Sequence, residues 1–511
     1  MALSGLEQPL ESLGLAQDDE DNTAASESAQ LTEMGSTQTV DDIVATRRDG
    51  EGAEGPPDVI VDFVTMGMFI VDEIEYLPPK PPVRDILGGG GAYAALGARL
   101  FSPAPTLSRT VGWIVDKGSD FPEAMGDLIE SWKTAVIMRY DPDRLTTRGW
   151  NGYDEAERRA FRYMTPKKRL TAEDLPPSLL TARAFHILSS ASRCRELVQD
   201  IKSRRRKAID ALGPDHPAAA AILARPYFIW EPVPDLCTPD ELLDCTNTLP
   251  VVDVCSPNHT ELAAYMGDPH KGMDPETGKL SKAAVERACE QLLSAMPLQS
   301  YALVVRAAEH GCYVAKNGGR RYLRSDKSKS KSKSKSAEAA EEEEAKKNKG
   351  SHTPAVPKQD LHGGLRPDID MEALFAGLMQ DEEGSIAREE VEIDAGVEIW
   401  IPAVSGEAAE TGPETATEPD GSAPTRKPAV VDPTGGGNAF LGGFAVAVAR
   451  GKSLDEAAAW GNVAASFAIE QVGVPVLGED AEGRETWNGV RVEDRYAAYE
   501  TLLKSRGLLQ Q

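Results

Sequence analysis

A run of three glycines near the C-terminal end of the chain constrains the fold more than any other feature. Gly435, Gly436 and Gly437 follow an apolar pair, Val430–Val431, and lead into a run of small apolar residues after Asn438. This order predicts a strand, a glycine loop and a helix N-terminus, whose N–H groups and positive dipole end suit a phosphate. A tight turn without a ligand is the alternative, because glycine serves both purposes.

Biased segments decide how much of the 511-residue chain can form a core. Residues 1–57 are acidic and contain few large apolar groups, so we expect a disordered tail. We place one domain at 58–500, interrupted by polar insertions at about 326–390 and 404–426, and a C-terminal tail at 501–511. Within the first insertion, residues 371–379 have the apolar spacing of a short amphipathic helix.

Apolar runs alternate with polar turns and helix signals along the domain. This pattern predicts an α/β fold whose central, mostly parallel sheet has helices on both faces. The expected strands are 59–64, 185–188, 227–230, 251–254 and 303–305. We expect His186, inside an apolar run, to be hydrogen-bonded in the core rather than to be a ligand. Residues 73–86 contain four prolines, so we do not expect regular strands there.

Charge and cysteine usage bear on the partners and the compartment. The chain has 55 Lys and Arg against 82 Asp and Glu, and the formal net charge of −27 opposes general nucleic-acid binding. No apolar run approaches the roughly 20 residues that cross a bilayer, and no arginine precedes Arg47 to suggest a targeting segment. The six scattered cysteines read as reduced, mostly buried thiols.

We therefore expect a soluble cytoplasmic protein with neither membrane nor nucleic acid as a default partner. The basic cluster Arg204–Lys207 resembles a nuclear localisation patch and makes the nucleus the alternative location, although a solvated helix face is the preferred explanation of the cluster. The acidic tail and the insertions are the segments expected to contact protein partners.

The glycine run also carries a family resemblance. The order Asp432, Thr434, three glycines, Asn438 and Phe440 resembles the C-terminal signature of ribokinase-like (PfkB) sugar and nucleoside kinases, in the form of the fungal killer-maintenance group. The resemblance implies that Gly435–Gly437 form an anion hole. It also implies that position 438 holds the catalytic base, which in that family is an aspartate. An amide cannot act as a base near neutral pH.

Two stretches near the start of the domain resemble the substrate-binding parts of the same family. The resemblance implies that Asp72 hydrogen-bonds substrate hydroxyls and that Gly89 and Gly90 let the substrate approach the backbone. Tyr93 stands about where the family has an asparagine, so the usual sugar specificity is in doubt. A solvated loop acid is the alternative for Asp72, and core packing is the alternative for Tyr93.

Further positions are implied to bind Mg²⁺ and nucleotide. Asn258 and Glu261 match the Asn-x-x-Glu motif that holds the water ligands of Mg²⁺. A capping box, in which Asn258 caps a helix ending near Gly267, is the alternative. The positions implied to lie near the nucleotide are Arg306, Glu309, Gly311, Thr434 and Asn462. For Asn462, an amide on a helix surface is the alternative; its helix should open with a capping box, Ser453-x-x-Glu456.

The resemblance as a whole implies a ribokinase-like fold with a small lid. It implies transfer of a phosphoryl group from ATP, with Mg²⁺, to a hydroxyl of a sugar-like or nucleoside-like substrate, weakened because position 438 is an amide. The alternative function is that of a pseudokinase, which binds nucleotide or sugar and acts as an interaction or regulatory protein.

Overall fold

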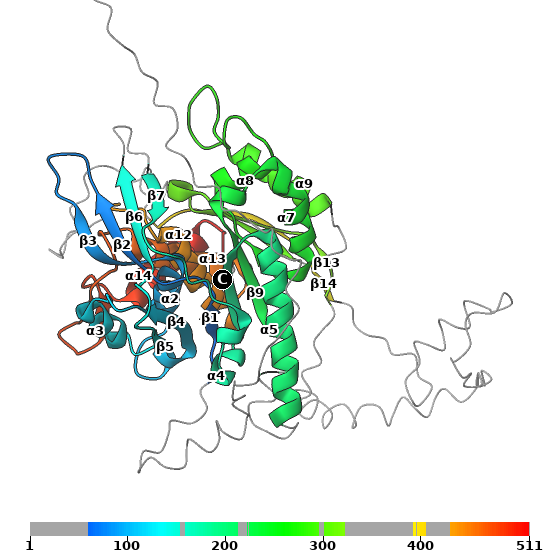
Figure 1. Cartoon of the computed structure of the whole chain (residues 1–511). Helices are drawn as coiled ribbons and strands as arrows, with labels where there is room; N and C mark the ends of the chain where they lie inside the picture. Colours follow the sequence, from blue (N-terminus) through cyan, green and yellow to red (C-terminus); the bar gives the residue numbers. More distant parts are fainter. Residues whose placement is uncertain are drawn as a thin grey trace, which may run out of the picture. The chain divides into compact units, whose positions relative to one another are not determined.

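A nine-stranded sheet forms the centre of this computed structural model, with helices packed around it (Figure 1). The structure describes residues 60–153, 159–212, 222, 224–295, 301–321, 392–394, 396–404 and 430–509, all within one compact unit, Pro56–Gln511. The predicted tail at 1–57, the insertion at 326–390 with its helix, and almost all of the insertion at 404–426 lie outside the described residues.

The strand order of the sheet is β15-β12-β11-β10-β9-β8-β1-β4-β5. All neighbours from β11 to β5 are parallel, whereas β12 is antiparallel to both of its neighbours. The predicted mostly parallel sheet is therefore confirmed. The strands are β1 (Phe63–Thr65), β4 (Val111–Lys117), β5 (Ala135–Tyr140), β8 (Ala184–Ser189), β9 (Tyr227–Pro232), β10 (Val254–Cys255), β11 (Ala302–Arg306), β12 (Cys312–Lys316) and β15 (Val397–Ile401).

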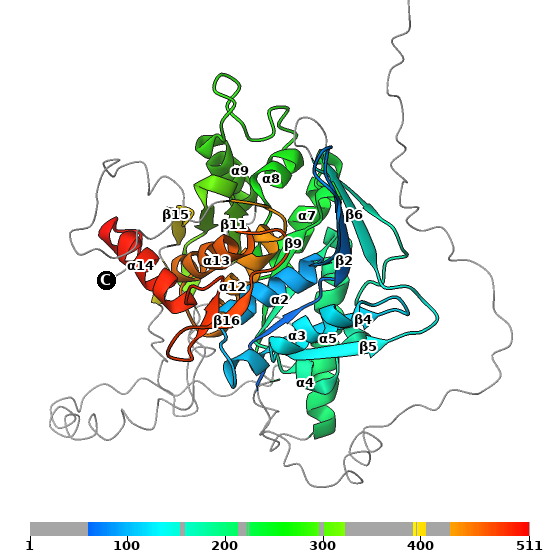
Figure 2. The ribbon, with the colours of Figure 1, turned by 90° about the vertical axis from the view of Figure 1, so that its left-hand side faces the viewer.

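Helices cover both faces of this sheet, and each face has its own core. Strand alternation sends Val304 of β11 into one core and Leu303 into the other. One core packs against α2 (Gly90–Leu100), α3 (Glu123–Ser131), α12 (Gly436–Ala449), α13 (Leu454–Ala468) and α14 (Val492–Ser505). The other packs against α4 (Pro177–Leu180), α5 (Ala191–Leu212), α7 (Leu242–Thr248), α8 (His259–Tyr265) and α9 (Lys282–Ser294). In Figure 2, α2, α12 and α13 lie side by side.

A second, four-stranded sheet has the order β3-β2-β6-β7 and corresponds to the predicted small lid. Its strands are β2 (Ile70–Glu75), β3 (Val83–Gly88), β6 (Arg148–Tyr153) and β7 (Arg159–Tyr163). The prediction that the prolines of residues 73–86 would prevent strands here was wrong. The prolines fall between β2 and β3, where no ladder hydrogen bond requires their missing N–H groups. Two short pairs complete the strands: β13 (Gly319–Arg321) with β14 (Glu392–Asp394), and β16 (Leu477–Glu479) with β17 (Glu485–Trp487).

Three expectations about local structure need correction. The pair Val430–Val431 is exposed and forms no strand. The expected strand at 251–254 is regular only from Val254, because a 3₁₀ turn occupies Leu249–Val251. The boundary that we placed at residue 500 falls inside α14, and beyond it Leu503 and Leu509 are buried.

The basic cluster of α5 is not a uniformly solvated face. Arg205 is only 4% exposed and donates hydrogen bonds to the carbonyls of Leu180, Ala182, Ile222 and Ala224. The Arg205 guanidinium is therefore bound by carbonyl groups of the protein itself and does not face a partner. The six cysteines are free and buried, as the sequence predicts. None of the described helices combines the length and the apolar character that crossing a bilayer requires.

Glycines let α12 and α2 touch through their backbones. A Cβ built on Gly442 would lie 1.9 Å from the carbonyl oxygen of Ala94 on α2. A Cβ on Gly97 of α2 would lie 1.9 Å from the carbonyl oxygen of Ala439 on α12. Both contacts are too short for any side chain, so these glycines set the distance between the two helices.

We predict that Gly442→Ala destabilises the fold by about 1–3 kcal/mol, because its methyl group would overpack the α2–α12 contact. Gly126→Ala is the matched control, since Gly126 is also helical and its Cβ would meet only a ring carbon of Phe121, at 3.4 Å. There we expect no loss, or a gain of up to about 1 kcal/mol from helix propensity. Chemical denaturation measures both changes, and similar values for the two variants would contradict the packing argument.

Candidate functional site

Four strands of the central sheet, β1, β8, β9 and β11, carry polar residues on the same face of the sheet. On each strand a core residue of the α12 face is followed two positions later by a polar one, so strand alternation turns all four polar side chains towards α12. These core and polar residues are Phe63 and Thr65 on β1, Ala184 and His186 on β8, Ile229 and Glu231 on β9, and Val304 and Arg306 on β11. The carboxyl ends of parallel strands are where open α/β sheets place their sites.

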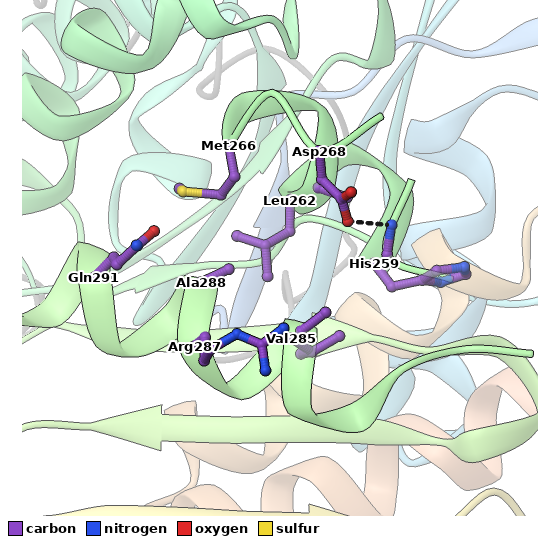
Figure 3. Close-up of a pocket in the computed structure, with 11 residues that line it drawn as sticks. His259, Leu262, Met266, Asp268, Val285, Arg287, Ala288 and Gln291 are labelled. Atoms are coloured by element: carbon purple, nitrogen blue, oxygen red, sulfur yellow. Dashed lines mark hydrogen bonds between the residues drawn. The ribbon is translucent and has the colours of Figure 1, made fainter. Parts of the chain in front are cut away.

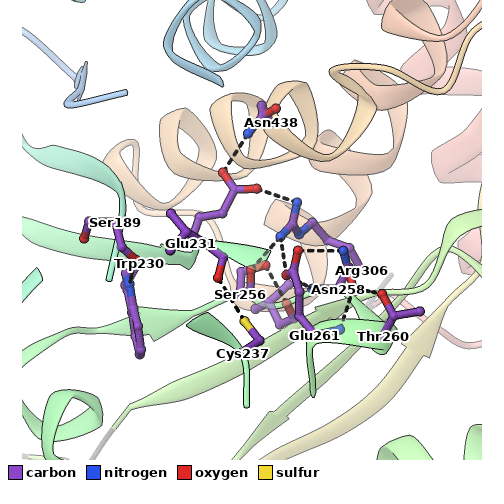
Figure 4. Close-up of polar contacts among 12 residues, drawn as sticks. Ser189, Trp230, Glu231, Cys237, Ser256, Asn258, Thr260, Glu261, Arg306 and Asn438 are labelled. Atoms are coloured by element: carbon purple, nitrogen blue, oxygen red, sulfur yellow. Dashed lines mark hydrogen bonds and ion pairs between the residues drawn. The ribbon is translucent and has the colours of Figure 1, made fainter. Parts of the chain in front are cut away.

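Glu231 lies between Asn438 and Arg306 and contacts both (Figure 4). One of its oxygens, Oε1, accepts a hydrogen bond from Arg306 Nη1 at 2.6 Å. The other, Oε2, lies 2.9 Å from His186 Nε2 and accepts from Asn438 Nδ2 at 2.8 Å. His186 Nδ1 lies 3.0 Å from the hydroxyl of Thr65. His186 is thus a hydrogen-bonded core residue, as expected, but its partner Glu231 is an acid that no motif in the sequence indicated.

The surroundings of Glu231 keep its buried carboxylate charged. Burial alone raises its pKa, but the charge of Arg306 and the hydrogen bonds from His186 and Asn438 outweigh burial and lower the pKa to about 2. The N-terminal end of α12 adds partial positive charge nearby. Such an acid is a weak base, so Glu231 does not replace the missing aspartate as a proton acceptor.

The glycine run forms the first turn of α12 rather than a separate loop. Gly435, in the left-handed conformation (φ 78°), is the N-cap. In the first hydrogen bond of the helix, Ala439 N–H donates to the Gly435 carbonyl at 2.8 Å. Gly436 N–H donates to the carbonyl of Pro433 at 3.2 Å. A Cβ on Gly437 would lie 2.3 Å from Arg306 Nη1. The glycine at 437 therefore brings a guanidinium group against the positive end of a helix, and the two together favour an anion.

Asn258 and Glu261 form the capping box of α8, which was the alternative explanation. The Asn258 side chain accepts from Glu261 N–H at 2.8 Å, and the two Glu261 oxygens accept from Asn258 N–H and Nδ2, both at 2.7 Å. Glu261 also lies 3.5 Å from Arg306 Nη2. Burial raises the pKa of Glu261, against the opposing effect of Arg306. Of the two buried acids beside Arg306, Glu261 is therefore the one whose negative charge is less stabilised.

The positions implied to bind substrate gather near the start of α2. Asp72 is a buried residue of β2, so the alternative of a solvated loop acid was wrong. A Cβ on Gly90 would lie 3.0 Å from Asn438 Nδ2, which places the first turns of α2 and α12 side by side. Gly89 has a φ of 86° and packs against the carbonyl of Met68. Tyr93 is 3% exposed and its ring fills the space over Gly435, which is the core-packing alternative.

The positions implied to bind nucleotide are more dispersed. Asn462 is neither on the helix surface nor open to the site, because its Nδ2 donates to the carbonyls of Ile401 and Pro402 and to the Tyr499 hydroxyl. Gly311 (φ 80°) forms the β11–β12 turn. The Glu309 side chain on that turn is 76% exposed. Thr434 N–H donates to the carboxylate of Asp432 at 2.9 Å.

A separate cavity of about 160 Å³ lies between α8 and α9 (Figure 3). Its lining is largely apolar and includes Leu262, Met266 and Val285, with His259 and Asp268 at its edges. The cavity is on the side of α8 away from Glu261, and none of the predicted site residues lines it. The cluster of polar side chains around Glu231 and this cavity therefore lie in different parts of the molecule.

We predict that Glu231→Gln lowers the stability of the protein near neutral pH but reduces its loss of stability in acid. A folded pKa of about 2, against an ordinary value of 4.5, gives stability that is complete above pH 4.5 and disappears as the pH falls towards 2. The difference in unfolding free energy between parent and variant should shrink by about 3 kcal/mol over that interval. Denaturation at several pH values measures it. Glu482→Gln, at a side chain that is 64% exposed, is the control, and parallel curves for parent and Glu231→Gln would refute the prediction.

Comparison with known proteins shows what this chain is similar to. A family model described as pfkB family carbohydrate kinase matches residues 419–477, which include the start of α12. Protein MAK32 of Saccharomyces cerevisiae is 29% identical over 448 residues, 85% of this chain and 91% of that protein. An uncharacterized protein of Schizosaccharomyces pombe is 28% identical over 456 residues, 88% of this chain and 95% of that protein.

Solved structures are similar at a greater distance. A probable sugar kinase protein from Rhizobium etli has a TM-score of 0.46 at 13% identity, over 88% of this chain and 100% of that one. A ribokinase from Giardia lamblia has the same score and identity, over 81% of this chain and 95% of that one. The chain is therefore similar to the pfkB family of carbohydrate kinases around the start of α12, and to the two fungal proteins over most of its length.

Proposed function

We propose that this chain transfers a phosphoryl group from ATP to a hydroxyl of a sugar-like or nucleoside-like substrate, at a low rate. The site would lie where α12 begins, beside the ends of β9 and β11. The observation that carries the proposal is the contact between Arg306 and Gly437, which joins a fixed cation to the N-terminus of a helix. The similarity to the pfkB family of carbohydrate kinases suggests the reaction class.

In the proposed reaction, the acceptor oxygen forms a bond to the terminal phosphorus while the bond from that phosphorus to the bridging oxygen of ADP breaks. The first turn of α12 and Arg306 would stabilise the negative charge of the transferring group. The hydroxyl proton leaves to solvent, because the amide of Asn438 cannot accept it. Loss of a general base costs about 10²–10⁴-fold in rate, which is why we propose a slow enzyme.

Glu261, oriented by Asn258, would hold Mg²⁺ through the water ligands of the cation. A carboxylate suits the water ligands of this cation, and the raised pKa of Glu261 is the response expected of an acid without enough positive charge around it. Asn258 donates to both Glu261 oxygens and so would orient the acid rather than bind the metal itself. When bound, Mg²⁺ supplies charge neutralisation for the phosphates.

One observation favours the alternative, a pseudokinase that binds without turnover. Both terminal nitrogens of Arg306 already have partners, namely Glu231, the Ser256 carbonyl and Glu261. A phosphate would have to compete with these contacts. The same pairing that stabilises the fold therefore reduces the attraction available for a ligand.

We predict that the parent protein binds ATP more tightly with Mg²⁺ than with EDTA, and that Glu261→Gln reduces this difference by about 10–100-fold. Isothermal titration calorimetry measures both affinities, with Glu482→Gln as a control remote from the site. Gly436→Val is not a clean test, because its Cβ would lie 2.7 Å from Ile469 and disturb packing. Absence of binding at millimolar ATP in the parent, or equal affinities in parent and Glu261→Gln, would reject the site.

Turnover separates the two functions. Formation of ADP by the parent with a panel of sugars and nucleosides supports the kinase. Mg²⁺-dependent ATP binding with no ADP formed above the buffer rate supports the pseudokinase.

A further inference from the structure

We propose that Glu231 is a positioning residue for Asn438: it fixes which end of the amide faces the acceptor position, and it excludes an aspartate at 438 unless position 231 gives up its own charge. The catalytic part of this inference rests on the proposed function. The contact between the two side chains does not.

Hydrogen-bond chemistry settles the orientation of the Asn438 amide. An ionised carboxylate only accepts hydrogen bonds, so the atom of Asn438 that lies 2.8 Å from Glu231 Oε2 must be Nδ2. Turning the amide over would place two oxygens in contact. Asn438 is half-buried, and with Nδ2 committed to the core, Oδ1 is the end directed away from Glu231. The side chain thus presents an acceptor oxygen to a substrate hydroxyl, as an aspartate would, but without a charge.

An aspartate at position 438 would meet Glu231 at the same short distance. Two carboxylates in contact do not both ionise near neutral pH, so the pair would retain a proton and titrate as one unit. Arg306 cannot neutralise both, because it lies on the other oxygen of Glu231, 2.6 Å away. The single change Asn438→Asp is therefore expected to add strain rather than a working base.

Exchange of both residues keeps every hydrogen bond. In Glu231→Gln with Asn438→Asp, the new amide nitrogen donates to Asp at 438 and to His186 Nε2, while the amide oxygen still accepts from Arg306. His186 then carries its proton on Nδ1 and donates to Thr65, a tautomer that the 3.0 Å contact permits. The net charge is unchanged, and the carboxylate has moved from the core to the half-buried position.

A double-mutant cycle on thermal and chemical unfolding tests the contact itself. We expect Asn438→Asp to be destabilised at pH 8 and partly restored at pH 5. The reason is that the folded pKa of the acid pair is raised, so stability is lost as the pH rises through it. The double variant should be more stable than the sum of the single changes predicts, by at least tenfold in the unfolding constant. Additive effects with no dependence on pH would overturn the proposal.

Turnover of Mg²⁺-ATP in the same four proteins tests the catalytic part. We expect Asn438→Asp alone to stay within about threefold of the parent and the double variant to exceed both singles by tenfold or more, up to the range of general-base catalysis. A gain in Asn438→Asp alone equal to that of the double variant would refute the positioning role. The matched control pair is Glu470 and Asn488, where an asparagine Nδ2 again donates to a glutamate, at 3.1 Å, beside an arginine. Exchange there should leave turnover unchanged.

The two arms fail separately. Coupling in the unfolding cycle with no turnover in any of the four proteins rejects the proposed function and retains the contact between Glu231 and Asn438. Turnover in the parent without coupling rejects the contact and retains the function.

Discussion

The buried ion pair between Glu231 and Arg306 is the interaction on which the candidate site depends. Taking both charges out of water is costly, and a short contact of 2.6 Å together with hydrogen bonds from His186 and Asn438 offsets that cost. The same atoms join β8, β9 and β11 to the start of α12. Removal of the Glu231 side chain would therefore leave Arg306 charged, buried and without its nearest partner, and would affect the site and the fold together.

Close packing of α12 against α2 brings the polar groups around Glu231 together. Gly442 and Gly97 bring α12 and α2 into backbone contact, and this contact fixes where the first turn of α12 meets the sheet. Gly437 then admits Arg306, and Gly90 admits the amide of Asn438. Glycine is required at these positions because side chains would occupy the space that the polar groups use. The polar cluster at the start of α12 and the close contact of the two helices therefore both depend on glycines.

Local patterns in the sequence predict much of the fold. Continuous apolar runs predict the buried strands, Asn258 with Glu261 and Ser453 with Glu456 predict two capping boxes, and the three glycines predict a helix start. Where tertiary contacts override local preference, the sequence misleads: Arg205 and Asn462 are buried by carbonyl groups that lie far away in the chain. The role of Glu231 depends on a residue 207 positions away. The only signal for Glu231 in the sequence is that an acid directly follows the apolar run 227–230. That signal does not indicate that Asn438 is its partner. For the same reason Asn438→Asp looks like a simple restoration in the sequence and a carboxylate clash in the structure.

The most direct test is the ionisation of Glu231 itself, followed as its side-chain carboxyl ¹³C resonance in protein labelled at glutamate and assigned by its absence from Glu231→Gln. If Arg306, His186 and Asn438 hold the charge as described, the resonance stays in its ionised position through pH 4.5 and moves only as the pH approaches 2, while the protein remains folded. A titration midpoint near the ordinary value of 4.5 would contradict the account, because it would mean that the contacts around Glu231 do not stabilise its charge.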